Sequence, residues 1–188
     1  KVIAFDRHSF DSLSKKNISQ LIGGQTTTEL IVFENYIVNF QRIAEGDFLG
    51  AQVLNQGKTT SAVFERFDIS DEVNSGVGLV TLFGHSSSTI TDIEIGFASD
   101  PGFGYNNTGD YPVLLVNGCN AGNIFTNTRT LGEDWTLTPE KGAIAFMSNS
   151  AFASSSSLRR FSELYYELAY ANEESFGFSL GNILREVA

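Results

Sequence analysis

The chain has 188 residues, of which 41% are hydrophobic and 12% aromatic, so it can bury one core of its own. Its 22 acidic and 12 basic residues give a formal net charge of −10, which excludes a basic surface for nucleic acid and disfavours anionic membranes. The single cysteine excludes an internal disulfide, and no apolar run approaches the roughly 18 residues that a membrane-spanning helix needs, so no membrane insertion is expected.

Apolar patterns alternate between strand and helix after residue 16. Residues 1–16 show no clear pattern and are left unassigned. In chain order, the patterns predict a strand at 18–22, a helix at 28–44, a strand at 51–54, a helix at 68–74, strands at 77–83 and 112–116, a helix at 131–138, a strand at 142–147, and helices at 156–171 and 179–188. The last helix lacks a Gly or Pro terminator, so we expect the chain to be a piece of a longer protein.

The predicted fold class is α/β, with a doubly wound, mostly parallel sheet and helices on both faces. Parallel neighbours need crossover connections, and helices between strands supply them. Residues 86–110 interrupt this alternation because they are rich in Ser, Thr, Gly and Asn. We interpret them as a loop over the site rather than as a crossover helix.

Two of the predicted strands end beside residues that can carry chemistry. The strand at 77–83 runs into His85, and the strand at 112–116 runs into Cys119. Because ligands collect outside the carboxyl ends of parallel strands, the thiol and the imidazole form a candidate nucleophile and base. Taken singly, such a cysteine is more commonly a small buried hydrophobe, and such a histidine a core or surface group. Their shared position, flanked by glycines that let backbone N–H groups approach a carbonyl, favours a cysteine hydrolase.

Two other kinds of site have weaker support. One cysteine and two histidines without clustered carboxylates fall short of a ligand set, so no metal site is predicted there. The glycines at 76–78 precede a strand, and no G-x-G-x-x-G sequence opens a helix, which argues against a dinucleotide-binding turn.

The segments around the two residues resemble a known family. The histidine and cysteine blocks of the gingipain-type cysteine peptidases of clan CD, the clan of caspases and legumains, are similar to GVGLVTLFGHSS at 76–87 and to PVLLVNGCNAG at 112–122. Further similarity lies in LGEDW at 131–135 and KGAIAF at 141–146. The resemblance covers residues 17–188, which we therefore expect to form the gingipain-like peptidase domain. It is closest to the branch that contains the sortase-like signal peptidase of the type IX secretion system.

The resemblance implies a caspase-like fold and a mechanism. Cys119 is expected to attack the scissile carbonyl, and His85 to protonate the leaving amine. The backbone amides of Ser86 and Cys119 are expected to hold the oxyanion. No cofactor is required. The expected partners are a polypeptide substrate and other domains of a longer chain, and the expected location is outside a bacterial cell or on its surface.

Three departures from the family bear on activity and specificity. Ser86 stands where the family has glycine, which would strain the backbone if the position needed a positive φ. Ile22 replaces an acidic residue that orients the histidine, which leaves Glu29 or Glu34 as substitutes. Leu30 stands at the acidic position of the specificity pocket, so strict basic specificity is not expected. Phe152 falls where an aromatic residue lines that pocket, which favours an apolar or small side chain at the cleaved position. The alternative for this phenylalanine is an ordinary core position.

An inactive domain is the alternative function. The departures at Ser86 and Ile22 favour a catalytically silent gingipain-like domain that binds a polypeptide or serves as a structural module. Structural calcium is a further possibility, since carboxylates surround the loop between the two candidate residues. These carboxylates are Asp92, Glu94, Asp100 and Asp110, and a solvated acidic loop is the favoured interpretation of them.

Overall fold

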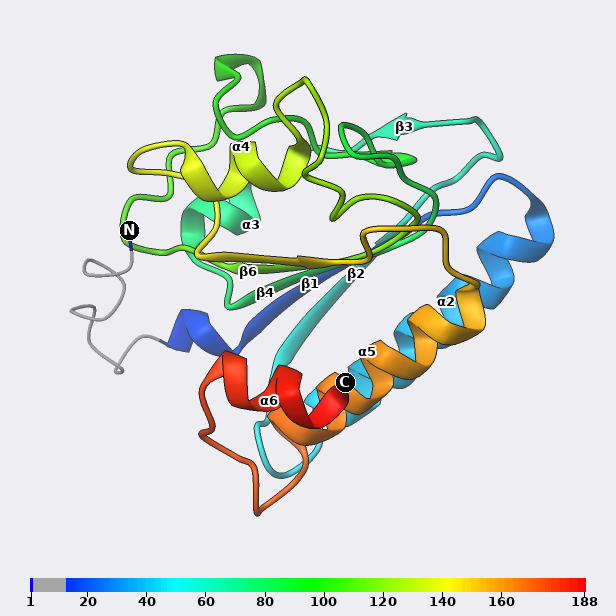
Figure 1. Ribbon diagram of the computed structural model, residues 1–188. Coiled ribbons are helices and arrows are strands. Elements are labelled where there is room, and N and C mark those ends of the chain that lie inside the picture. Colours follow the sequence, from blue (N-terminus) through cyan, green and yellow to red (C-terminus); the bar gives the residue numbers. More distant parts are fainter. Residues whose placement is uncertain (2–12) are drawn as a thin grey trace.

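The computed structural model describes residue 1 and residues 13–188 of the chain (Figure 1). Its central sheet has five parallel strands in the order β2-β1-β4-β6-β7. Their bounds are β1 Asn17–Ile22, β2 Gln52–Gly57, β4 Leu79–Phe83, β6 Val113–Asn117 and β7 Ala145–Ser148. A second sheet pairs β3 (Glu65–Arg66) with β5 (Ile93–Glu94), also in parallel.

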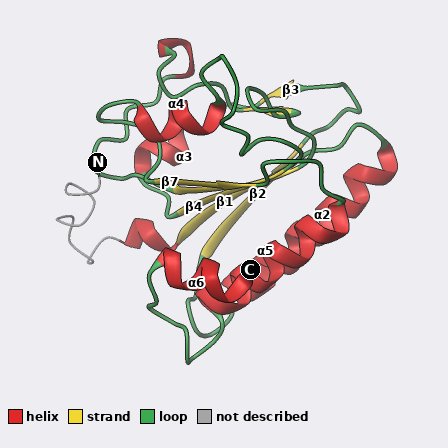
Figure 2. Ribbon diagram, viewed as in Figure 1, coloured by secondary structure: helices red, strands yellow, loops and turns green. Residues whose placement is uncertain are grey.

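Helices cover both faces of the sheet (Figures 1 and 2). The face below the sheet in Figure 1 carries α2 (Thr27–Ala44), α5 (Ser155–Tyr170) and α6 (Leu180–Val187). The upper face carries α3 (Ser70–Ser75) and α4 (Leu131–Leu137). Two short 3-10 helices, η1 (Leu13–Lys16) and η2 (Pro101–Phe103), complete the described elements. Within the described residues, no helix has both the length and the apolar character that crossing a membrane requires.

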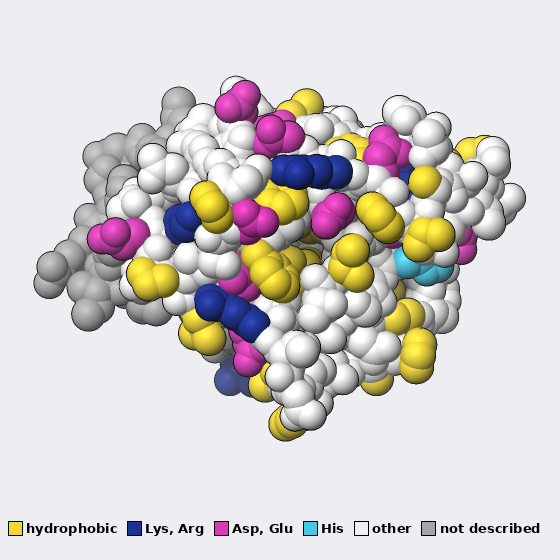
Figure 3. All heavy atoms as spheres, turned by 90° about the horizontal axis from the view of Figure 1, so that it is seen from above, with side chains coloured by type: hydrophobic (Ala, Val, Ile, Leu, Met, Phe, Trp, Pro, Cys, Tyr) yellow, Lys and Arg dark blue, Asp and Glu magenta, His cyan; other side chains and the backbone are white. Residues whose placement is uncertain are grey.

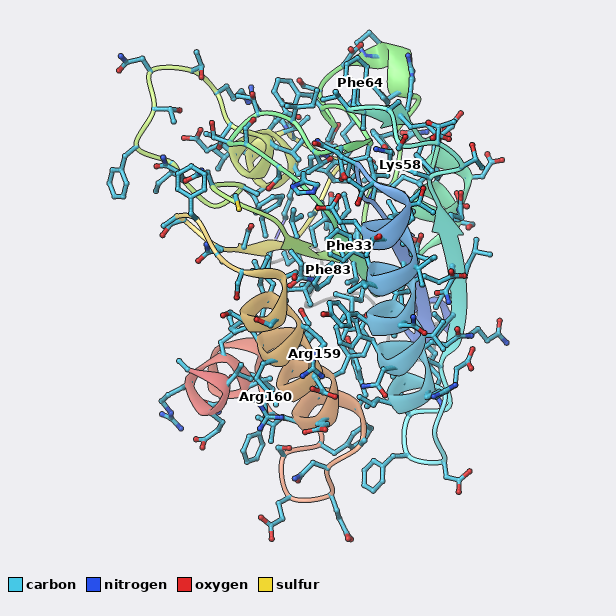
Figure 4. All side chains as sticks on the ribbon, turned by 90° about the vertical axis from the view of Figure 1, so that its right-hand side faces the viewer. Phe33, Lys58, Phe64, Phe83, Arg159 and Arg160 are labelled. Atoms are coloured by element: carbon cyan, nitrogen blue, oxygen red, sulfur yellow. The ribbon has the colours of Figure 1, made fainter. Side chains whose placement is uncertain are left out.

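Alternation along the strands builds a separate core on each face of the sheet. On β4, Val80 and Leu82 pack in the upper core, while Leu79 and Phe83 pack in the lower core. The lower core is aromatic around Phe83, whose ring centroid lies 5.0 Å from that of Phe33 on α2 (Figure 4). The sheet is therefore covered by side chains on both sides, as a parallel sheet requires.

The strand order fixes where a site can form. The chain passes from β1 outward to β2 and then returns to the other side of β1 as β4, so the direction of winding reverses between β1 and β4. In doubly wound sheets, this switch point opens a crevice at the carboxyl ends of the strands. The carboxyl edge is the right-hand edge of the sheet in Figure 1, and α2 and α5 both begin there.

The fold class predicted from the sequence is confirmed. The five predicted strands and the five predicted helices all occur. Their bounds differ from the prediction by a few residues at most. The two-residue strands β3 and β5 were not predicted, because elements this short show no periodicity. Residues 2–12 of the unassigned segment lie outside the described residues.

The segment at 86–110 differs from the expected loop over the site. It contains β5 and η2, and Ile93, Ile95 and Tyr105 are buried in the upper core. Only its first residues lie beside His85, whereas the rest crosses the upper face. It is a crossover without an α-helix, held by apolar side chains at positions where the sequence suggested only a polar loop.

Candidate active site

The sheet register places His85 and Cys119 at the ends of adjacent strands. The β4–β6 pairing ends at Phe83 and Asn117, and the Gly84 N–H continues it by donating to the Asn117 carbonyl at 3.0 Å. His85 and Cys119 each follow their strand by two residues. Because neighbouring strands lie about 4.8 Å apart, the two residues leave the sheet side by side.

Both side chains are directed to the face covered by α2 and α5. The His85 ring centroid lies 6.2 Å from that of Phe33 on α2. The Cys119 thiol, half-buried, donates to the Ala153 carbonyl at 3.6 Å, just before α5 begins. Among the described residues, no hydrogen bond joins Sγ to the imidazole, so the structure brings the two strand ends together without a direct thiol–imidazole hydrogen bond.

Ser86 ties the two strand ends to each other. Its hydroxyl donates to the Cys119 carbonyl at 2.8 Å. A side chain at Gly118 would collide with the same hydroxyl, so the glycine is needed for this close approach. The non-glycine residues with positive φ in the described chain are Asn120 and Glu140. Ser86 therefore replaces glycine without backbone strain, and Asn120, directly after the cysteine, is the strained neighbour instead.

Two backbone N–H groups at the site have no acceptor within the part of the chain that the structure describes. Ser86 forms an isolated antiparallel bridge with Thr91. The bonds of this bridge lie on either side of Ser86: the Asp92 N–H donates to the His85 carbonyl at 2.8 Å, and the Ser87 N–H donates to Ile90 at 2.8 Å. In such a pair the N–H of the central residue faces away from the partner strand. No described residue accepts from the N–H of Ser86 or of Cys119.

Glu29 supplies a carboxylate beside the imidazole. Its Oε1 lies 3.1 Å from His85 Nε2, a close approach that is not aligned as a hydrogen bond. Its Oε2 accepts from the Gln25 N–H at 2.9 Å, and its own N–H donates to the Thr26 hydroxyl that caps α2. Of the two substitute carboxylates considered from the sequence, the structure brings Glu29 to the histidine, whereas Glu34 is exposed farther along α2.

The charge of Glu29 is favoured by its surroundings. Burial alone would raise the pKa of this carboxyl. The Gln25 N–H and the neighbouring His85 charge outweigh that effect, so the pKa of Glu29 lies below its ordinary value. The His85 side chain remains 41% exposed while Nε2 is shielded against Glu29, so the rest of the ring is open to a substrate.

The residues predicted to line a specificity pocket lie apart from the nearest cavity. Phe152, in the loop after β7, is 86% exposed, so the core alternative for it is wrong. Leu30 is half-buried on the first turn of α2. A cavity of about 300 Å³ between β6, β7 and α5 is lined by neither of them. Its lining residues are Leu115, Val116, Asn117, Ser148, Asn149, Ala153, Ser157, Leu158 and Phe161.

This cavity was not predicted, although it adjoins Cys119. Ala153 lines it and also accepts the thiol hydrogen bond, and Asn117 precedes the cysteine by two residues. Asn117 is buried and fixed, because its Oδ1 accepts from Ser162 of α5 at 2.6 Å. The sequence could not locate the cavity, since one wall comes from β6 and the other from the later segment that contains β7 and the start of α5.

The loops at the carboxyl edge expose apolar side chains. Phe125 in the loop after β6 is 90% exposed, and several hydrophobic residues of neighbouring loops are also open. These are Val63, Phe64, Ile90, Ile124 and Phe152. Figure 3 shows hydrophobic side chains around the histidine at the right-hand edge of the molecule. We call these six residues the apolar rim.

The carboxylates considered for calcium do not form a group. Among the described residues, no three His, Cys, Asp or Glu side chains gather closely enough to hold a metal ion. Asp100 accepts from the Gly102 N–H at 2.8 Å and caps η2. Asp92 is buried, so the solvated-loop interpretation is wrong for this residue. Calcium binding here stays a prediction that would depend on backbone carbonyls as well as carboxylates.

Comparisons with known proteins agree with this fold. The model of peptidase family C25 matches residues 1–188. The fold is similar to the crystal structure of the Arg-specific cysteine proteinase gingipain R, with a TM-score of 0.70 and 11% identity over 96% of this chain and 43% of that one. It is also similar to the complex of the RgpB pro- and mature domains from Porphyromonas gingivalis, with a TM-score of 0.67 and 14% identity over 98% of this chain and 45% of that one. The chain thus spans less than half of either structure, and a search of curated proteins found no match.

Proposed function

Because the chain belongs to peptidase family C25, we propose that it is a cysteine endopeptidase domain that cleaves peptide bonds with Cys119 and His85. The observation that carries this proposal is the junction of the two strand ends. The register sets the residues side by side, and the Ser86 hydroxyl holds the Cys119 backbone at 2.8 Å. Acyl transfer requires a nucleophile, a proton carrier and N–H donors at one place. The proposal assigns these three parts to groups at this junction.

The proposed reaction follows from the positions of these groups. The Cys119 thiolate adds to the scissile carbonyl, and the N–H groups of Ser86 and Cys119 stabilise the oxyanion that forms. His85 gives its proton to the leaving amine as the C–N bond breaks, which leaves a thioester on Cys119. Water then attacks the thioester while His85 takes its proton, and the carboxylic acid and the thiolate are released. With Nε2 held against Glu29, Nδ1 is the nitrogen left to carry the proton.

We further propose that the substrate is a polypeptide with an apolar or small side chain at the cleaved position. The 300 Å³ cavity beside Cys119 is lined by apolar and uncharged polar side chains. Leu30 and Phe152 lie outside this cavity and are proposed as separate substrate contacts. The apolar rim favours apolar residues on either side of the scissile bond. An unpaired arginine or lysine would find no carboxylate in this cavity.

The cellular location and the link to a secretion system are also proposals. Resemblance to secreted gingipains supports a role outside a bacterial cell or on its surface, as part of a longer chain. The similarity of the histidine and cysteine segments to the signal-peptidase branch supports a link to type IX secretion.

A silent binding domain is the second candidate. One observation favours it: the thiol donates to Ala153 rather than to the imidazole. In this case the apolar rim would hold a polypeptide without cutting it.

Cleavage of a peptide library decides between the two functions. We expect the chain to cut peptides with apolar residues at the cleaved position, and Cys119→Ser to abolish the cleavage. Mass spectrometry of the products identifies the cut sites. Absence of cleavage together with retained binding of the same peptides would establish the silent domain instead.

A further inference from the structure

A buried carboxylate occupies the switch point of the sheet. Asp92 is 4% exposed, and its carboxylate lies against the ends of β1 and β4. A side chain at Gly23 or at Gly84 would collide with the Asp92 oxygens. In other doubly wound sheets, this crevice receives a ligand. Here the chain fills it with its own acidic group.

Asp92 holds the two segments that carry His85 and Glu29. Its Oδ2 accepts from the Gly24 N–H at 2.8 Å, three residues before α2 begins. Its own N–H donates to the His85 carbonyl at 2.8 Å. One residue therefore fixes the backbone of the histidine and the turn that leads into the helix bearing Glu29.

Lys58 completes this arrangement from the third strand end. It follows β2, its side chain is buried, and Nζ lies 4.0 Å from Asp92 Oδ2 (Figure 4). Nζ also donates to the carbonyls of Gly24, at 2.8 Å, and Ala62. The Lys58 N–H donates to the Ile22 carbonyl at 2.9 Å. The ends of β1, β2 and β4 thus meet at one buried pair of opposite charges.

Stability alone does not account for such a pair. The cost of removing two charges from water offsets much of their attraction, and an apolar pair of the same size is often as stable or more so. Burial raises the pKa of Asp92, although the backbone N–H groups of Gly24 and His85 oppose this rise. One Asp92 oxygen, Oδ1, has no hydrogen-bond partner among the described residues. The buried charges of Asp92 and Lys58 are thus costly to maintain, and they lie next to the segment that carries His85.

We propose that Asp92 and Lys58 position the His85 imidazole against Glu29, a role that rests on the proposed function of His85. Both are positioning residues, since neither reaches the edge where a substrate binds. Without the pair, the Gly24 turn loses its bond to the residue whose backbone N–H holds the His85 carbonyl, and we expect the 3.1 Å approach of Nε2 to Glu29 to be lost.

The first test reads the imidazole directly. The chain has two histidines, so His8→Gln leaves the His85 ring nitrogens as the only imidazole signals in a ¹⁵N spectrum. In this background, Glu29→Gln shows which ¹⁵N shifts the imidazole has when the contact between His85 and Glu29 is absent. We expect Asp92→Asn to move the signals toward those shifts, and unchanged signals would overturn the proposal.

A matched control removes a second buried aspartate. Asp134 on α4 is also buried, accepts from the Ser99 N–H at 2.9 Å and pairs with Arg129 at 3.1 Å. Asp134→Asn therefore brings a comparable loss of stability away from the site, and we expect the His85 signals to stay in place. Equal shifts in both variants would show a general structural effect and contradict positioning.

Lysine variants keep the test decisive if Asp92→Asn does not fold. We expect Lys58→Met to move the His85 signals as Asp92→Asn would, and Lys58→Arg to restore them by keeping the charge. If Lys58→Met left the signals unmoved, the pair would have no positioning role.

A second test couples the pair to the chemistry. We expect Asp92→Asn to slow alkylation of Cys119 about tenfold, less than the roughly 100-fold that a misplacement of about 1 Å can cost. In a His85→Ala background the same change should have no effect, because the residue acts through the histidine. An equal slowing in both backgrounds would overturn the proposal. If His85→Ala itself leaves alkylation unchanged while the ¹⁵N signals respond as expected, the proposed function fails and the positioning role stands.

Discussion

Glu29 is held by the turn before α2 and also contacts the candidate base. One carboxylate oxygen accepts from the Gln25 N–H, which leaves the other directed at His85. Because the Glu29 side chain is already fixed, it loses no further conformational entropy when it pairs with the imidazole. The carboxylate that Ile22 cannot supply thus lies beside His85 on the next element, α2. The sequence offered Glu29 and Glu34 equally, because both lie on the same helix and only the fold selects one.

Glu29→Gln should show this role as a pH dependence of stability. A pKa below the ordinary value of 4.5 means that the carboxylate stabilises the fold above that pH and ceases to do so as the pH falls through the folded value. We therefore expect a lower Tm for the variant at pH 7, and a difference that shrinks below about pH 4.5. Thermal unfolding of Glu34→Gln serves as the control. A difference that grows in acid would contradict this assignment.

Gly84→Ala should destabilise the site through Asp92. The added methyl group meets the buried carboxylate, and such overpacking costs about 1 to 3 kcal/mol. Gly181→Ala on α6 is the matched control, because its methyl group meets open space and the helix gains about 1 kcal/mol. Urea unfolding measures both. Equal effects of the two substitutions would show that Asp92 does not fill the switch point.

At the level of elements, the start of α5 borders both the thiol and the cavity. Ser154 caps the helix by accepting from the Ser157 N–H, and the residue before it accepts from Cys119. The first turn of α5 therefore sets the distance between the Cys119 thiol and the cavity wall. Ser157 lines the cavity, whereas Ser156 does not.

Ser157→Asp should change specificity without unfolding the domain. An acidic residue in the first turn is favoured by the helix dipole, so the fold is expected to be kept. A carboxylate in the cavity can pair with a basic side chain, so we expect new cleavage after Arg or Lys. Ser156→Asp adds the same charge to the same turn outside the cavity. A gain of basic cleavage in both variants would show that the cavity does not select the substrate.

At the scale of the whole molecule, the sheet and the strand-end positions of His85 and Cys119 were predictable from the sequence. Apolar runs that end in glycine and polar residues identify buried parallel strands, and their carboxyl ends share one edge. The ion pair of Lys58 and Asp92 was not predictable. Nothing local marks two residues that meet only because β1, β2 and β4 end together. Asp92 was instead interpreted as part of a solvated acidic loop, since its burial depends on the crossover that packs around it.

The exposed apolar side chains at the carboxyl edge of the sheet were also hard to predict from the sequence. From the sequence, Phe152 alone of these residues was considered for the site, whereas the structure shows that Phe64 and Phe125 are exposed as well. The chain covers less than half of the two structures it resembles. Under the proposed function, the apolar rim is the surface expected to contact a polypeptide substrate.

The central claim is that His85 activates Cys119, and the most direct test is the rate of alkylation of Cys119 by iodoacetamide against pH, for this chain and for His85→Ala. We predict a rate that is already high near pH 6 and collapses in the variant, because a neighbouring imidazolium favours the reactive thiolate. A rate that rises only near pH 8.5, the value of an ordinary thiol, and is the same in both proteins would contradict it.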